Sequence, residues 1–205
     1  IAQGRRVVLL AHSKGGADAV TALADPKNAD LLPKVSALLA IQPVYAGSKV
    51  ADLIGKSSVI QSVTDAFFEK VMPVIDRAVD TGDRDAVRDL RSETRQALLA
   101  KHPYPVERIP TVVVRSTTDG RSLIRPRHPL RQPLVIFQHY LAKQGTASDG
   151  LVALEDQRIP GAKAEITLED LDHFEPGIRG ESPHSPCEIT NRIVDAALPL
   201  FATKK

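Results

Sequence analysis

Ser13 lies in the segment AHSKGG of residues 11–16, a sequence context that is typical of a nucleophilic serine. The apolar run before it predicts a strand and the pattern after it predicts a helix, so Ser13 falls on a tight strand-to-helix turn. Such a turn, a nucleophile elbow, projects the serine hydroxyl off the end of a sheet. Ala11 and Gly15 are small, and we expect their size to prevent collisions with neighbouring backbone. The alternative is that residues 11–16 form a glycine-containing turn between strand and helix that has no catalytic role.

The helix expected after Ser13 supplies a second chemical feature. Backbone N–H groups in the first turn of a helix have no acceptor within the helix, and here they point at the reaction centre. We therefore predict that the backbone N–H of Lys14 is one donor of an oxyanion hole.

Serine is a weak nucleophile unless a general base takes its proton, and that base needs an orienting acid. The turn SDGLV of residues 148–152 contains Asp149, and His173 follows the predicted strand of residues 164–168. Serine, acid and histidine thus occur in the order that this type of site requires. We predict Ser13, Asp149 and His173 as a catalytic triad, with His173 as base and Asp149 as the acid that orients it.

Each partner of the serine has a rival. Asp119 lies in the turn TDG directly after a strand and competes with Asp149 for the role of acid. His184 is the rival base, because it also follows Asp149 in the chain. We favour Asp149 because its turn leads straight into the last strand, and His173 because it lies closer to that strand.

The remaining histidines are expected to lie outside the triad. His12 is part of the elbow, and we expect its side chain to pack beneath the serine. The others precede Asp149, which breaks the expected order: His102, His128 and His139.

Short apolar runs rich in β-branched residues predict the strands that position these side chains. They occupy residues 6–11, 35–41, 111–115 and 164–168, with helical patterns such as 17–24 and 189–200 between and after them. The first run is continuous, as in a strand buried on both faces. The alternation predicts an α/β fold with a mostly parallel sheet and helices on both faces, in a single domain over residues 1–205.

Residues 50–102 hold consecutive helical patterns, which predict a helical insertion between two strands. One helix face is expected at Phe67, Val71, Ile75 and Val79, and a narrower stripe at Val87, Leu90, Thr94 and Leu98. The insertion is either a lid over the mouth of the site or an ordinary layer that covers the sheet. Irregular loops are expected at residues 120–133 and 177–186.

Composition excludes several classes of function. The 27 basic and 25 acidic residues give a formal net charge of +2, which offers no case for binding nucleic acid. No apolar stretch approaches the roughly 18 residues of a transmembrane helix. The single cysteine, Cys187, allows no internal disulfide. These features predict a soluble protein, either cytoplasmic or secreted, and leave the oligomeric state open.

Several of these segments resemble a known family. AHSKGGADA is similar to the elbow of bacterial triacylglycerol lipases and related esterases, and IQPVYAGSKVADL to their segment after the next strand. SDGLV resembles their acid turn and DHFEP their histidine loop. The resemblance implies the α/β-hydrolase fold and hydrolysis of a small-molecule or lipid ester through an acyl-enzyme, with Ser13 as nucleophile and no cofactor. Some members bind calcium near the histidine loop, but no ligands are identified here, so no metal is predicted.

One departure from this family concerns the start of the chain. The fold places several strands before the elbow, and a loop after one of them gives the second oxyanion donor. We therefore expect the chain to be truncated at its N-terminus. A thioesterase or amidase with the same triad remains an alternative, as does an inactive remnant or binding module.

Overall fold

The computed structural model describes residues 4–56, 62, 84–119, 132–176 and 185–202. Its centre is a four-stranded sheet in the order β1-β2-β3-β4, in which all neighbouring strands run parallel. The strands are β1 (Val7–His12), β2 (Val35–Ile41), β3 (Thr111–Ser116) and β4 (Ala164–Leu168). Because the strands are parallel, all of their carboxyl ends lie along one edge of the sheet.

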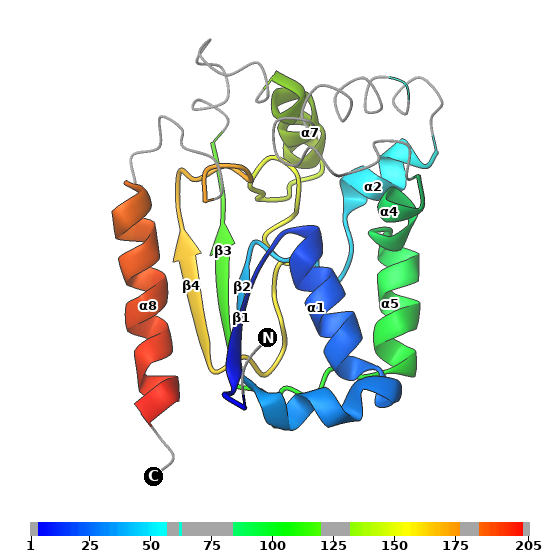
Figure 1. Ribbon diagram of the computed structural model, residues 1–205. Coiled ribbons are helices and arrows are strands. Elements are labelled where there is room, and N and C mark those ends of the chain that lie inside the picture. The colour runs from blue at the N-terminus through cyan, green and yellow to red at the C-terminus, as the bar shows by residue number, and fades with distance from the viewer. Residues whose placement is uncertain (1–3, 57–61, 63–83, 120–131, 177–184, 203–205) are drawn as a thin grey trace.

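Helices cover both faces of this sheet (Figure 1). One face carries α1 (Lys14–Ala24) and α5 (Ser92–Lys101), and the other carries α8 (Pro186–Ala202). A 3-10 helix, η1 (Pro26–Lys34), leads from α1 into β2. Nearer the carboxyl ends of the strands lie α2 (Lys49–Ile54), α4 (Arg84–Asp89) and α7 (Gln132–Lys143).

The alternation of side chains along β2 and β3 divides the core into two layers. Leu38, Ala40 and Val113 pack with Val20 and Leu23 of α1 on one face. On the opposite face the neighbouring strand residues pack with α8, in a cluster of Ala37, Leu39, Ile41, Val112, Val114, Ile189 and Ile193. Both central strands are therefore buried on both faces, as continuous apolar runs in a parallel sheet predict.

The predicted elements agree closely with the observed ones. The runs at 35–41 and 164–168 coincide with β2 and β4, and β3 extends one residue beyond the predicted 111–115. Helix α1 begins at Lys14, three residues before the predicted start at 17, so it follows the serine directly.

The prediction that the first strand is buried on both faces is wrong. Val8 is 44% exposed and Leu10 is 69% exposed. Among the described strands β1 pairs only with β2, and α8 packs over β2 and β3 on the face that Val8 and Leu10 share. An apolar run alone does not reveal whether a helix covers each of its faces.

Part of the predicted insertion at 50–102 is described as α2, α4 and α5. The face containing Phe67, Val71, Ile75 and Val79 lies outside the described residues. The stripe from Val87 to Leu98 is divided between two helices, because α4 ends at Asp89 and α5 begins at Ser92. Asp52 of α2 accepts hydrogen bonds from the Ser92 N–H (3.0 Å) and hydroxyl (2.6 Å), which fix this break.

Across the described residues, none of the helices combines the length and apolarity needed to cross a membrane. Cys187 is a free, exposed cysteine at the start of α8. The irregular loops predicted at 120–133 and 177–186 fall largely outside the described residues, which leave out 120–131 and 177–184.

We expect Leu38→Ala to lower the free energy of unfolding by about 3 kcal/mol, because Leu38 is fully buried and truncation leaves a cavity. Urea denaturation measures this change. The matched control is Leu31→Ala, at a side chain that is 38% exposed, where the expected loss is at most about 0.5 kcal/mol. Equal losses in the two variants would contradict the assigned core.

Candidate active site

Ser13 occupies a strained turn between β1 and α1. Its backbone has φ 55° and ψ −125°, a region that residues with a side chain rarely adopt. The turn is held in place because the Ser13 N–H donates to the Ile41 carbonyl (3.0 Å) and the Gly16 N–H donates to the Ser13 carbonyl (2.9 Å). The half-buried serine thus projects from the carboxyl edge of the sheet, as the elbow motif predicts.

The crowded glycine of the elbow is Gly16. A methyl group on Gly16 would lie 2.7 Å from Pro43 Cβ and 3.1 Å from Pro43 Cα, too close for carbon atoms. At Gly15 a methyl group would meet no atom of the described residues within 4 Å. The expectation that close approach requires a small residue at Gly15 is therefore wrong. The requirement falls on the next position, where α1 packs against the segment after β2.

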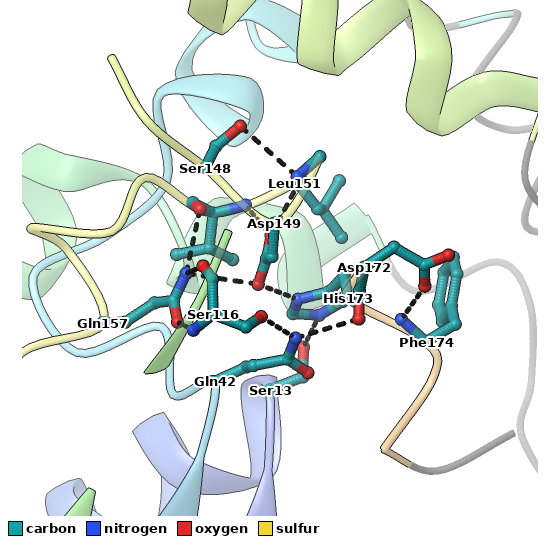
Figure 2. Close-up of polar contacts among 12 residues, drawn as sticks. Ser13, Gln42, Ser116, Ser148, Asp149, Leu151, Gln157, Asp172, His173 and Phe174 are labelled. Carbon is teal, nitrogen blue, oxygen red and sulfur yellow. Dashed lines mark hydrogen bonds and ion pairs between the residues drawn. The ribbon is translucent and has the colours of Figure 1, made fainter. Parts of the chain in front are cut away.

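A continuous line of hydrogen bonds joins Ser13, His173 and Asp149 (Figure 2). His173 Nε2 lies 2.7 Å from Ser13 Oγ, and His173 Nδ1 lies 2.7 Å from Asp149 Oδ2. Since the carboxylate accepts from Nδ1–H, Nε2 is free to accept the hydrogen of the serine hydroxyl. The relative exposure of His173 is 1% and that of Asp149 is 0%. The structure therefore brings together the three residues predicted as a triad.

The Asp149 carboxylate is held by several donors besides His173. Its Oδ1 accepts from the backbone N–H groups of Leu151 (2.9 Å) and Val152 (2.7 Å). Its Oδ2 also accepts from Gln157 Nε2 (3.3 Å). A buried carboxylate is costly unless it is hydrogen-bonded, and these donors offset that cost. They also fix the oxygen that faces the imidazole.

Asp119, the rival acid, is not part of this line of hydrogen bonds. Asp119 follows β3 but is exposed, whereas Asp149 is buried against His173. His102 caps the end of α5, and His139 is an exposed residue of α7. His184, the rival base, lies outside the described residues, and so does His128.

His12 was expected to pack beneath Ser13, and the structure shows that its side chain also contacts His173. Its ring lies against that of His173, with ring centroids 5.1 Å apart and an angle of 38° between the planes. Its Nε2 is 3.0 Å from Gln42 Oε1 and 2.9 Å from the His173 carbonyl oxygen. Burial, and secondly the neighbouring imidazole of His173, lower the pKa of His12 to about 4. His12 is therefore neutral at pH 7.

Two buried glutamines that the sequence analysis did not single out support the site. The amide of Gln157 forms two hydrogen bonds with the backbone of Ser116, accepting from its N–H (2.9 Å) and donating to its carbonyl (3.1 Å). Gln42 Nε2 donates to Ser116 Oγ and to the Asp172 carbonyl (3.0 Å). A glutamine that directly follows the apolar run of residues 35–41 was the available sequence signal for Gln42.

Lys14, whose backbone N–H is the predicted oxyanion donor, directly follows Ser13. Lys14 is the first residue of α1, so its backbone N–H belongs to the turn that has no acceptor within the helix. Its side chain instead pairs with Asp18 at 2.7 Å.

A metal site was not predicted. Within the ranges that the structure describes, no three His, Cys, Asp or Glu side chains gather so as to hold a metal ion. The polar groups around Ser13 are instead linked to one another and to the backbone.

The chain is similar in structure to bacterial lipases and esterases. It matches the mature lipase of Bacillus licheniformis with a TM-score of 0.60 and 21% identity, over 83% of this chain and 60% of that one. A metagenomic carboxyl esterase matches with a TM-score of 0.63 and 22% identity, over 96% and 55%. The lipase of Staphylococcus hyicus matches with a TM-score of 0.64 and 15% identity, over 98% and 72%. No protein-family model and no curated protein sequence matches the chain.

These likenesses identify the fold as the α/β-hydrolase fold found in bacterial lipases and esterases. At 15% to 22% identity they show the fold alone. The chain spans 60% of the Bacillus licheniformis lipase and 55% of the metagenomic esterase.

We expect Gly16→Ala to destabilise the fold by about 1–3 kcal/mol, because the added methyl group collides with Pro43. Gly15→Ala is the matched control, and its effect ranges from neutral to a gain of about 1 kcal/mol from helix propensity. Thermal or urea denaturation of both variants measures the difference. Equal destabilisation would show that the two positions are equally crowded.

The stability of the fold is expected to fall as the pH is lowered from about 6.5 to about 4, in part because of His12. In this window the unfolded chain binds a proton at His12 that the folded chain excludes, so acid favours unfolding. The contribution is roughly 1–3 kcal/mol. Urea denaturation across this range, for wild type and His12→Gln, isolates it. Parallel stability curves would contradict the assigned environment of His12.

Proposed function

We propose that this chain hydrolyses carboxylic esters through an acyl-enzyme formed on Ser13. The observation that carries the proposal is the pair of 2.7 Å contacts that links the Ser13 hydroxyl through His173 to Asp149. Support also comes from the fold, which the chain shares with solved lipases and esterases. The expected substrate is a small-molecule or lipid ester.

In the acylation step, Ser13 Oγ attacks the ester carbonyl carbon while His173 Nε2 takes the hydroxyl proton. Asp149 accepts the hydrogen bond from Nδ1–H and thereby stabilises the imidazolium that forms. Negative charge develops on the former carbonyl oxygen, and the backbone N–H of Lys14 is a donor to it. When the intermediate collapses, His173 gives the proton to the departing alcohol, the C–O bond breaks, and the acyl group stays on Ser13.

In the deacylation step, water replaces the alcohol and the same groups act again. His173 Nε2 takes a proton from the water as its oxygen attacks the acyl carbon. The second intermediate then expels Ser13 Oγ, which regains its proton from His173. The products are the carboxylic acid and the free enzyme.

The position of Ser13 at the start of α1 favours this chemistry electrostatically. The N-terminus of a helix carries a partial positive charge, and α1 extends from Lys14 over 11 residues. This charge is oriented before the reaction begins, so it stabilises the oxyanion without reorganisation.

We expect Ser13→Ala to abolish turnover of a short-chain p-nitrophenyl ester and labelling by a fluorophosphonate probe. Asp149→Asn is expected to lower kcat by about 10⁴-fold, since the imidazole then favours the wrong tautomer. The matched control is Asp119→Asn, at the exposed aspartate, where kcat is expected within about twofold of wild type. Steady-state kinetics and mass spectrometry of the labelled peptide measure these effects.

Three results would overturn the proposal or one part of it. A folded wild-type chain that neither reacts with the probe nor hydrolyses the ester would favour an inactive remnant or a binding module. A larger loss of kcat in Asp119→Asn than in Asp149→Asn would show that Asp119, and not Asp149, is the acid that orients His173. Faster hydrolysis of a matched thioester or amide than of the ester would show that the chain is a thioesterase or an amidase.

A further inference from the structure

Gln42 is placed to act on the backbone that carries His173. It follows β2 directly, is fully buried, and has a φ of 45°. Its own backbone N–H donates to the Val114 carbonyl (2.7 Å), so the main chain stays attached to β3 despite the left-handed conformation. Its side-chain Nε2 reaches the Asp172 carbonyl oxygen at 3.0 Å (Figure 2).

The contacts of Gln42 also fix the orientation of His12. Because the carbonyl oxygen of Asp172 can only accept, the amide NH₂ of Gln42 faces it and Oε1 faces His12. His12 must then carry its hydrogen on Nε2. That single N–H is shared between Gln42 Oε1 (3.0 Å) and the His173 carbonyl oxygen (2.9 Å).

The two carbonyl groups held in this way belong to consecutive residues, Asp172 and His173. The backbone N–H of His173 is held as well, because it donates to the Asp149 carbonyl (2.9 Å). His12 immediately precedes Ser13. The end of β1 therefore carries the nucleophile and also donates a hydrogen bond to the backbone of His173, the residue that accepts the serine proton. Few bonds therefore separate the two groups, and these bonds determine the distance between Ser13 Oγ and His173 Nε2.

We propose that His12 and Gln42 are a positioning pair that fixes the backbone of His173 relative to Ser13. This inference rests on the proposed ester hydrolysis for its kinetic consequence, but its structural consequence is independent of the substrate. Neither residue is expected to touch the reacting atoms. Their contribution is to keep Nε2 within hydrogen-bonding distance of the serine hydroxyl through the catalytic cycle.

The neutrality of His12 suits this role. Burial lowers its pKa to about 4, so near pH 7 it donates a hydrogen bond without carrying a positive charge. Its ring lies 5.1 Å from that of His173, which becomes positively charged during each turnover. A permanently charged donor at this place would oppose that charge.

The test uses two substitutions at one position. His12→Phe keeps a flat ring beside His173 but removes the N–H donor, and His12→Gln restores an N–H at similar reach. With a p-nitrophenyl ester, we expect His12→Phe to lower kcat by about 10- to 100-fold with KM within about twofold, as a small misplacement of a catalytic group does. His12→Gln is expected to recover kcat to within about threefold of wild type.

A second measurement needs no substrate. The His173 Nδ1–H that bonds Asp149 is expected to give a far-downfield proton resonance in the wild type and in His12→Gln. In His12→Phe this resonance is expected to broaden or vanish, as the imidazole loses its fixed position. Denaturation midpoints confirm that each variant is folded, and if His12→Phe fails to fold, Gln42→Met takes its place with the same readouts.

The outcomes separate the two proposals. If the wild type shows no Ser13-dependent hydrolysis, the proposed function fails, and the resonance alone decides whether the positioning pair exists. If a folded His12→Phe retains both the resonance and the wild-type kcat, the positioning pair is overturned. Equal loss in His12→Gln and His12→Phe would also overturn it, since restoring the N–H at position 12 would then restore no activity.

Discussion

The hydrogen bond between His173 Nδ1 and Asp149 Oδ2 is the interaction to which the rest of the site is fitted. It is buried, and it decides which nitrogen of the imidazole faces Ser13. To form it, two loops must meet above the sheet, one after β4 and the other in the long connection between β3 and β4. A parallel sheet makes this possible because it gathers the carboxyl ends of all its strands along one edge.

The polar groups around this bond are mostly neutral. Asp149 receives two backbone N–H groups and the amide of Gln157, and Gln42 joins Ser116 to the Asp172 carbonyl. Amides and backbone groups satisfy a buried carboxylate without introducing further charges, each of which would need its own partner. Gln42, which follows β2, contacts His12 at the end of β1 and Ser116 at the end of β3, so the ends of these strands are linked beneath the loops that carry Asp149 and His173.

The sequence predicted the strands, their order along the chain and the three residues that meet, because each signal is local. Ser13 lies in a strand-turn-helix pattern, and His173 follows the last strand. The supporting contacts were not predictable, since Gln42 meets Ser116 through the pairing of β2 with β3 and meets Asp172 through the fold of the loop after β4. For the same reason motif spacing directed attention to Gly15, whereas the packing of α1 against Pro43 makes Gly16 the crowded position.

The nucleophile follows β1, which like β4 has a single neighbour among the described strands. Among the described strands β1 shares hydrogen bonds with β2 alone, and Leu10 on its open face is 69% exposed. Local opening of such a strand requires less free energy than opening of the enclosed β2 or β3. On gentle warming, Ser13 would part from an imidazole and carboxylate that remain joined to each other. Activity would then be lost at a lower temperature than the one at which the rest of the fold unfolds. Any contact that stabilised β1 would raise the temperature of this loss.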